Sequence, residues 1–471
     1  MVGITSMGIH IPLYRISGAE IARMWGSSNL GGQKAVAGCD EDSLTMAVSA
    51  AIEGMSRDGR KMDGVFFCTT TAPYKEKQAA AIIASAIDLE SECYTSDFCN
   101  SLRAGTLAMR AAIDSVNCGS AGKIAVIASD CRLGAAQSRF EQLLGDGAAA
   151  AIIGAKNVIA EIEGTYSVYN EFIDTWRTDE DAFERGTEER FVDSVGYRPM
   201  LKQVMSGIME KYGLAAKDFS KVIFNAPDAR AHAAAAKMMG FEVAQVQDNF
   251  FAAIGNTGTA ASFIMLAAAL DHALPGQRML FINYGDGADA FILRVTDEIQ
   301  KGRSKATVKE KIDSSIPISY GKYAMWRGLV RVEESRLPDR PLLSAQCLQR
   351  EKKNVLALYG GKCKSCGTPQ YPKNRVCVVC HAKDTCEDYK FSDKRAKLFT
   401  FSVDHLQPTL NPPGVNGVVD FEEGGRLVCE LTDCDPMKLE AGMAVEMTFR
   451  KLYQTRGINN YFWKAKPVST R

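Results

Sequence analysis

The sequence predicts a duplicated α/β layer fold over about the first 300 residues, followed by a small metal-binding module and a short all-β barrel. In the first part, short β-branched runs alternate with longer helices of small residues, which is typical of α/β layers. Gly145-Asp146-Gly147-Ala148 and Gly285-Asp286-Gly287-Ala288 lie about 140 residues apart and each precede a strand-like run, which indicates an internal repeat. The last 70 or so residues alternate as short strands between turns that contain Pro, Gly and Asp.

The composition is that of a globular protein with several domains. At 471 residues, with 46% hydrophobic and 24% charged residues, the chain is too long for one ordinary core, and two to four domains are expected. The 56 basic residues balance 56 acidic ones, so there is no electrostatic case for nucleic acid or an anionic membrane. No apolar run approaches the ~18 residues of a transmembrane helix, and the N-terminus reads as a first strand, not a signal peptide. Ten of the 14 cysteines are scattered singly, which favours reduced thiols in a cytoplasm.

Apolar periodicity predicts the individual elements of the first part. The predicted strands are Gly64–Cys68, Cys93–Phe98, Lys123–Ser129, Ala148–Ile153, Lys221–Phe224, Arg278–Asn283 and Ala288–Val295. The predicted helices are Asp42–Ser56, Lys77–Ile87, Leu102–Val116, Arg198–Tyr212, Ala229–Met239 and Thr259–Ala273.

The stretch Asp97–Met109 is the most informative part of this half. It joins a predicted strand to a predicted helix, and such a turn presents backbone N–H groups and the positive helix end to an anion or a thiolate. Its Ala104-Gly105-Thr106 is matched by Thr257-Gly258-Thr259-Ala260 in the second half, where another small-residue helix begins. Two matched motif pairs in the same order favour a duplicated unit.

The segment from Asp297 to about Glu351 is polar at first and then amphipathic. Ile316–Arg331 predicts a short helix with an aromatic face, either a docking helix or a packing element, with the two alternatives equally favoured. Ser335–Pro341, with its charges and two prolines, is typical of a connector.

Four cysteines stand apart from the others. Cys363 and Cys366 form one Cys-x-x-Cys pair, Cys377 and Cys380 form a second, and ten residues separate the pairs. Four such thiolates can complete a closed tetrahedral Zn²⁺ site, which is structural because no position remains for a substrate. A redox Cys-x-x-Cys explains either pair alone but not both. His381 follows the last cysteine and is expected outside the metal shell.

The C-terminal part predicts five short strands, which suit a small barrel of the OB type. They are Leu398–Val403, Gly417–Asp420, Arg426–Leu431, Met443–Arg450 and Asn459–Ala465.

The Ala104-Gly105-Thr106 turn and the helix behind it resemble the nucleophile turn of the thiolase superfamily, above all that of hydroxymethylglutaryl-CoA synthases and ketoacyl synthases of the third type. This resemblance implies a duplicated α/β/α/β/α fold, in agreement with the internal repeat. It also implies Claisen chemistry on acyl-CoA, which needs a cysteine thiolate, an acidic base and oxyanion donors.

The segment Cys363–Cys380 resembles the rubredoxin-like zinc ribbon of small acyl-CoA-associated proteins, in which an OB-fold follows. Leu431–Pro436 and Gly442–Arg450 match the later strands of that family, so the resemblance covers roughly residues 316–468. It implies coenzyme A thioesters as ligands and a thiolase-superfamily subunit as partner. Here the two partner types are joined in one chain.

Compared with the synthase motifs, three chemical positions are changed. Leu102 stands in the cysteine position, Thr70 in the acidic position of Cys68–Tyr74, and Asn225 in the histidine position of Val222–Asp228. A fourth landmark, the Asn256 motif Gly255–Gly258, is intact. Leucine cannot form a thioester, and threonine and asparagine can at most form hydrogen bonds.

Two residues could in principle replace the missing chemistry. Cys99, three residues before Leu102, is the fallback nucleophile, although it would need a reshaped turn. A lone buried cysteine is more often an inert small hydrophobe. His232, on a predicted helix, is expected to be a surface or packing histidine and not a substitute base.

The domain organisation expected from these observations has four parts: a thiolase-like domain (1–300), a linker with a docking helix (301–355), a zinc ribbon (356–390) and an OB-fold (391–471). The function expected is that of an accessory, non-catalytic subunit in a cytoplasmic complex that makes or cleaves carbon–carbon bonds between acyl-CoA thioesters. The nucleophile would lie on a separate thiolase-family chain, and this domain would form a homodimer within a hetero-oligomer. The alternative is an active synthase-like acyltransferase that uses Cys99. A nucleic-acid-binding OB protein is disfavoured because the chain has no basic stripe.

Overall fold

The computed structural model describes residues 1–56, 61–304, 306–333, 341 and 344–468. These residues divide into two units. The first contains Met1–Ala37, Asp42–Ala84 and Leu89–Tyr323. The second contains Ala324–Arg471 together with two short earlier segments, Gly38–Glu41 and Ser85–Asp88. The boundaries of the four expected domains stay a prediction, and most of the expected connector, residues 335–340, lies outside the described residues.

A nine-stranded sheet organises the first unit, in the order β11-β12-β13-β8-β1-β7-β6-β4-β5. The two halves of the sheet meet where β1 pairs with β8 at Gly3 and Ile4. Each half ends in parallel strands, β6-β4-β5 on one side and β11-β12 on the other, as expected for a duplicated unit. The strands are β1 (Gly3–His10), β4 (Gly64–Thr69), β5 (Tyr94–Cys99), β6 (Lys123–Asp130), β7 (Gly147–Gly154), β8 (Ala160–Tyr169), β11 (Lys221–Phe224), β12 (Arg278–Tyr284) and β13 (Gly287–Val295).

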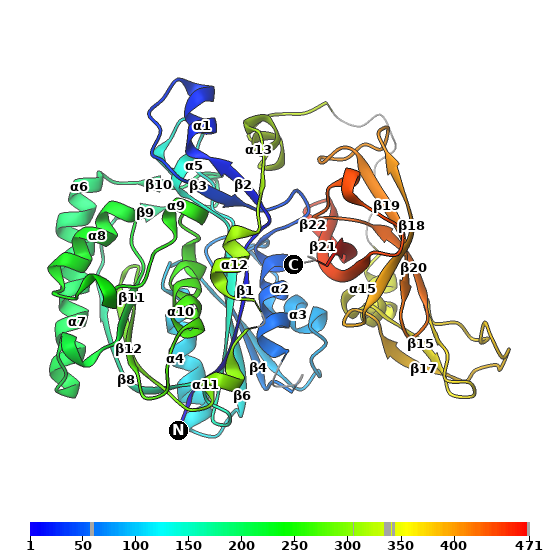
Figure 1. The fold of residues 1–471 in the computed structure, drawn as a ribbon, viewed down its shortest axis with the longest axis horizontal. Coiled ribbons are helices and arrows are strands. Elements are labelled where there is room, and N and C mark those ends of the chain that lie inside the picture. The colour runs from blue at the N-terminus through cyan, green and yellow to red at the C-terminus, as the bar shows by residue number, and fades with distance from the viewer. Residues whose placement is uncertain (57–60, 305, 334–340, 342–343, 469–471) are drawn as a thin grey trace. The chain divides into compact units, whose positions relative to one another are not determined.

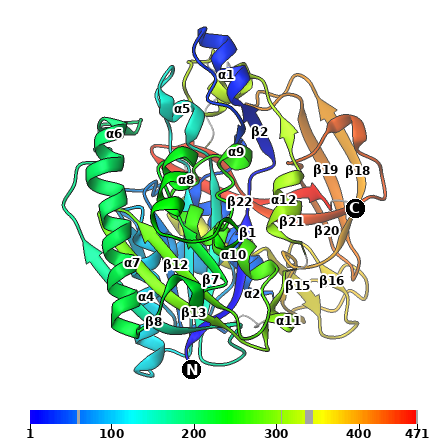
Figure 2. The same cartoon turned by 60° about the vertical axis from the view of Figure 1, so that its left-hand side comes forward.

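Two small-residue helices, α4 (Ala104–Asn117) and α10 (Ala261–Asp271), lie at the centre of this unit (Figures 1 and 2). Their buried faces share one apolar core with residues of both sheet halves. Close packing of the two helices explains the glycine of the Ala-Gly-Thr motif, because a Cβ at Gly105 would lie 2.6 Å from the ring of Phe263 on α10. The outer helices α2 (Ser43–Met55) and α3 (Ala79–Ala86) belong to the first half, and α7 (Arg198–Tyr212) and α8 (Ala229–Met238) cover the second. These layers confirm the predicted thiolase-like α/β/α/β/α fold.

Shorter elements complete the first unit. They are β2 (Tyr14–Ser17), α1 (Gly18–Trp25), β3 (Gln33–Val36), α5 (Arg139–Leu143), β9 (Thr175–Trp176), β10 (Arg185–Gly186), α6 (Glu189–Phe191), α9 (Phe251–Ile254), α11 (Ile299–Gly302), α12 (Val308–Asp313) and β14 (Ile316–Pro317). The helix α13 (Tyr320–Trp326) begins in the first unit and ends in the second. The helix expected over Ile316–Arg331 is thus shorter and follows a two-residue strand. Tyr320 and Tyr323 are buried, the former donating its hydroxyl to Glu141 at 2.7 Å, which favours the packing alternative for this aromatic face.

The second unit contains two sheets. The ribbon sheet has the order β16-β15-β17, and the barrel has five antiparallel strands in the order β20-β19-β18-β21-β22. A bridge between Leu431 and Ala465 brings the two edge strands together. All five predicted strands are present, which confirms the OB-type barrel. The elements are α14 (Ala345–Arg350), α15 (Lys352–Ala357), β15 (Tyr359–Cys363), β16 (Pro369–Gln370), β17 (Cys386–Lys390), β18 (Ala396–Asp404), β19 (Gly414–Phe421), β20 (Arg426–Glu430), β21 (Ala444–Thr455) and β22 (Ile458–Pro467).

A buried ion cluster ties the early segment Gly38–Glu41 into the second unit. The guanidinium of Arg450 is fully buried and lies 3.0 Å from Glu41 and 2.5 Å from Asp433. Lys464 pairs with Asp40 at 2.9 Å. Because an unpaired buried charge is costly, these partners hold one another in place.

Candidate active site and metal centre

Leu102 lies in the turn between β5 and α4, at the position expected for a nucleophile. Ser101 donates its hydroxyl to Asp286 at 2.6 Å, and Asn283 donates its amide to the Leu102 carbonyl at 3.1 Å. A Cβ on Gly285 would lie only 3.1 Å from the Cβ of Leu102, so the Gly-Asp-Gly turn of the second half lies against this residue. The helix begins at Ala104 and not at Leu102 as predicted, because the turn is held by these bonds.

Asn225, in the position of the expected histidine, bridges the ends of β11 and β12. Its amide nitrogen donates to the Tyr284 carbonyl at 2.9 Å, and its amide oxygen accepts from the Tyr284 N–H at 2.7 Å. Its side chain therefore extends the parallel pairing of these strands by one more pair of hydrogen bonds. Asn225 is only 6% exposed, and its amide is used for these backbone hydrogen bonds and does not face a ligand.

Thr70, in the acidic position, follows β4 beside a buried carboxylate. Asp130 accepts from the Thr69 hydroxyl at 2.9 Å and the Thr70 N–H at 2.7 Å, and its other oxygen accepts from the Thr259 N–H at 2.8 Å. The hydroxyl of Thr70 is buried and finds no hydrogen-bond partner among the described residues. A buried hydroxyl without a protein partner is usually satisfied by an ordered water or another bound group.

Asn256 links these positions into one site. Its amide oxygen accepts from Arg132 at 2.9 Å, and its nitrogen donates to the carbonyl of Ala226, the residue after Asn225, at 3.3 Å. Gly258, two residues further on, lies against the Asp130 carboxylate. Contacts thus run from Leu102 through Gly285 and Tyr284 to Asn225, and from Asn225 through Asn256 and Asp130 to Thr70.

Neither fallback residue has the properties of an activated group. Cys99 is exposed at the end of β5, but partial desolvation of its sulfur and the carboxylates of Asp97 and Asp130 raise its pKa, which disfavours the thiolate. His232 stacks on Phe224 at 4.2 Å between ring centres and is 4% exposed. Burial lowers the pKa of His232 to about 4, so the ring is neutral at pH 7. This is the packing histidine that the sequence predicts.

A carboxylate–phenol pair at the same edge was not anticipated. Asp174, in the loop after β8, shares a hydrogen bond with the hydroxyl of Tyr284, and burial raises the pKa of both groups. Arg132 favours the charged form of Asp174. Tyr284 immediately precedes the Gly285-Asp286-Gly287 motif, which was the available signal, but nothing in the sequence links it to a residue 110 positions earlier.

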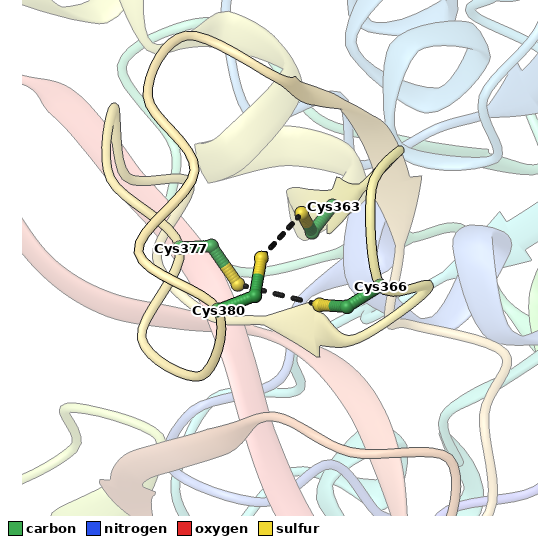
Figure 3. A group of neighbouring side chains, drawn as sticks. All are labelled: Cys363, Cys366, Cys377 and Cys380. Carbon is green, nitrogen blue, oxygen red and sulfur yellow. Dashed lines mark hydrogen bonds between the residues drawn. The ribbon is translucent and has the colours of Figure 1, made fainter.

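The four cysteines of the ribbon come together as one cluster. Figure 3 shows their sulfurs pointing toward one another, and all four lie within 4.8 Å of each other. Cys363 and Cys380 are 3.7 Å apart, and Cys366 and Cys377 are 3.6 Å apart (Figure 3). A tetrahedral ion with Zn–S bonds of about 2.3 Å needs sulfurs about 3.8 Å apart, so the cluster fits Zn²⁺.

The two halves of the cluster are built alike. Gly367 follows the second cysteine of the first pair, and its N–H donates to the Cys363 carbonyl at 2.8 Å. His381 follows the second cysteine of the other pair, and its N–H donates to the Cys377 carbonyl at 3.1 Å. Both residues have positive φ, 76° and 57°, which glycine adopts easily and histidine rarely does. His381 is thus a turn residue, and it does not belong to the cluster of four thiols.

Models of known families match three segments of the chain. Residues 209–295 match the C-terminal domain of 3-oxoacyl-[acyl-carrier-protein] synthase III. Residues 350–385 match the rubredoxin-like zinc ribbon domain of ChsH2, and residues 389–450 match the C-terminal OB-fold domain of ChsH2. The zinc ribbon and barrel predicted from the cysteine spacing and strand pattern are therefore confirmed.

Relatives match about 70% of the chain. The hydroxymethylglutaryl-CoA synthase of Archaeoglobus fulgidus is 35% identical over 344 residues, which are 70% of this chain and 100% of that protein. The chain belongs to the hydroxymethylglutaryl-CoA synthase family. A second member, from Methanothermobacter thermautotrophicus, is 34% identical over 346 residues and is likewise covered along its whole length.

Solved structures agree with this family assignment at the level of fold. An HMG-CoA synthase complexed with CoA has a TM-score of 0.63 at 18% identity, covering 72% of this chain and 92% of the other. PksG, an HMG-CoA synthase from Bacillus subtilis, has a TM-score of 0.60 at 21% identity, covering 70% and 89%. Within the described parts of this family member, no helix is both long and apolar enough to cross a membrane.

Proposed function

We propose that this chain is the acyl-CoA-binding accessory subunit of a complex that makes or cleaves carbon–carbon bonds between acyl-CoA thioesters. The observation that carries the proposal is Leu102, which stands where the family carries its acyl-accepting cysteine and cannot form a thioester. The nucleophile then belongs to a thiolase-family partner chain. Free thiols throughout the chain fit a reducing compartment such as the cytoplasm.

Two further observations support this proposal. The nitrogen and the oxygen of the Asn225 amide are both hydrogen-bonded to the backbone of Tyr284. Little hydrogen-bonding capacity therefore remains to polarise a substrate. Thr70 offers a hydroxyl that can hold a ligand but cannot remove a carbon-bound proton. The zinc ribbon and the barrel, which match domains of a protein other than the synthases, would help to bind CoA and the partner. The synthase-like domain would form a homodimer within the hetero-oligomer.

The second candidate is an active acyltransferase. Family membership favours it, because the relatives that match over their full lengths are named synthases and not accessory proteins. Cys99 would then carry the acyl group, with Asp174 and Tyr284 available as proton-transfer groups near Leu102. The raised pKa of Cys99 counts against this candidate, since it requires an external base to form the thiolate.

Mass spectrometry separates the two candidates. The purified full-length chain is incubated with a panel of acyl-CoA thioesters, quenched in acid, digested and searched for acylated cysteine. The accessory role requires no stable adduct on residues 1–300, together with binding of the same thioesters and co-purification of a thiolase-family chain. An adduct on Cys99 with turnover by the isolated chain, both lost in Cys99→Ala, would establish the enzyme. Cys118→Ala, another exposed cysteine, serves as the matched control.

A further inference from the structure

The zinc ribbon contains a fifth cysteine, Cys386, that the four-cysteine cluster does not use. It is the first residue of β17 and pairs directly with Cys363 on β15. Side chains of directly paired residues lie on the same face of a sheet, so the thiol of Cys386 lies on the side from which Cys363 reaches the cluster. Cys386 is half-buried, whereas Cys363 is fully buried.

The strand register makes this pair geometrically suited to a covalent bond. The Lys364 N–H donates to the Thr385 carbonyl at 2.9 Å, so these two form a hydrogen-bonded pair. The neighbouring pair, Cys363 and Cys386, is therefore a non-hydrogen-bonded pair, with Cα atoms typically about 4.5 Å apart. Disulfides span Cα separations of about 4.4–6.8 Å. The typical separation of such a pair lies within this range.

The surroundings hold Cys386 beside the cluster. The buried amide of Gln370 donates to the Cys386 sulfur at 3.2 Å, and its oxygen accepts from the N–H of Val378, between the two cysteines of the second pair. Gly361, on the same face of β15, lets Lys373 and Cys386 approach this strand closely: a Cβ there would lie 3.0 Å from the Lys373 side chain and 3.4 Å from the Cβ of Cys386.

We propose that Cys386 is an oxidation site whose disulfide with Cys363 releases zinc from the ribbon. A peroxide oxidises the Cys386 thiol to a sulfenic acid and leaves as water. The Cys363 thiolate attacks that sulfur, the S–S bond forms, the S–O bond breaks, and the departing hydroxide takes up a proton to give a second water. Two electrons pass from the two sulfurs to one peroxide. Only Cys366, Cys377 and Cys380 would then remain to hold Zn²⁺, and the opened site would bind the ion less tightly.

Zinc release and disulfide mapping test this proposal on the full-length, zinc-loaded chain. Hydrogen peroxide is added after removal of reductant, free zinc is followed with pyridylazoresorcinol, and peptides are mapped without reduction. The expected result is a linked peptide joining Cys363 to Cys386 that appears with the released zinc and is reversed by dithiothreitol with added zinc. Cys386→Ser should bind one zinc and release it severalfold more slowly under peroxide. Cys347→Ser, which removes an exposed thiol outside the ribbon, should behave as the unaltered chain.

Three outcomes would overturn the proposal. In the first, the unaltered chain loses zinc while its earliest disulfide joins two of the four cluster cysteines. In the second, Cys386→Ser releases zinc at the unaltered rate. In the third, Cys386→Ser and Cys386→Ala are folded but lack zinc before oxidation, which would make Cys386 a metal ligand. The mapping on the unaltered chain decides the matter even where a variant fails to fold.

Discussion

Replacing Asn225 by alanine should open the edge between β11 and β12 in the first unit. The change removes the 2.9 and 2.7 Å hydrogen bonds to the backbone of Tyr284, a residue that is itself 4% exposed. Leaving a buried N–H or C=O without a partner costs about 1–3 kcal/mol for each group, so the free energy of opening should fall by about 2–6 kcal/mol. Asn225→His should lower the free energy of opening by a similar amount. Imidazole is wider than a carboxamide and its nitrogens point apart, so it cannot make both backbone bonds.

Hydrogen exchange followed by mass spectrometry measures this opening strand by strand, which suits a chain of several domains. Peptides covering Lys221–Phe224 and Arg278–Tyr284 should exchange faster in the variant, while the ribbon and barrel should not change. Asn117→Ala, at the exposed last position of α4, is the control. Unchanged protection of both strands would refute the structural role of Asn225. So would a gain of acyl-CoA turnover in Asn225→His, since it would reveal a working catalytic position that lacks only its histidine.

Three further predictions test other parts of the molecule. Leu102→Cys should gain an acyl adduct from an acyl-CoA in mass spectrometry if the turn still faces the ligand, whereas Leu102→Ser should gain none. Cys363→Ser should lose stoichiometric zinc by metal analysis, and retention of zinc in a folded ribbon would contradict the four-thiolate site. Burial lowers the pKa of His232 from 6.5 to about 4, so unfolding takes up a proton below pH 6.5. The neutral ring of His232 therefore contributes about 3 kcal/mol to the free energy of unfolding above pH 6.5, and this contribution is lost as the pH falls toward 4. Urea midpoints measured at pH 7 and pH 4.5 should differ less in His232→Gln.

The periodic elements were predictable because their apolar pattern is local. The strand Lys221–Phe224 and the helix Arg198–Tyr212 have the bounds that the sequence predicts. Strand β8 was not predicted, because Glu161 and Glu163 interrupt its apolar pattern and its burial depends on pairing with β13. The hydrogen bond between Asp174 and Tyr284 could not be predicted either, because it joins a loop to the end of a strand that is distant in the sequence. The zinc cluster was accessible because metal ligands must follow short, fixed spacings.

The motif residues that survive in the first unit differ in kind from those that are changed. Asp130 and Asn256 bind backbone groups of neighbouring elements, and Gly258 leaves the space that Asp130 occupies, so all three are required to assemble the layers. Of the three positions at which the sequence predicts changed chemistry, only Asn225 serves the fold through its side chain, which bonds the backbone of Tyr284. Leu102 and Thr70 contribute backbone groups: the Leu102 carbonyl accepts from Asn283, and the Thr70 N–H donates to Asp130. An intact motif in this chain is therefore evidence for an intact fold and not for catalysis. Loss of Asp130 should consequently destabilise the domain whether or not the chain is an enzyme, whereas only an enzyme would lose turnover through Asp174→Asn with its stability preserved.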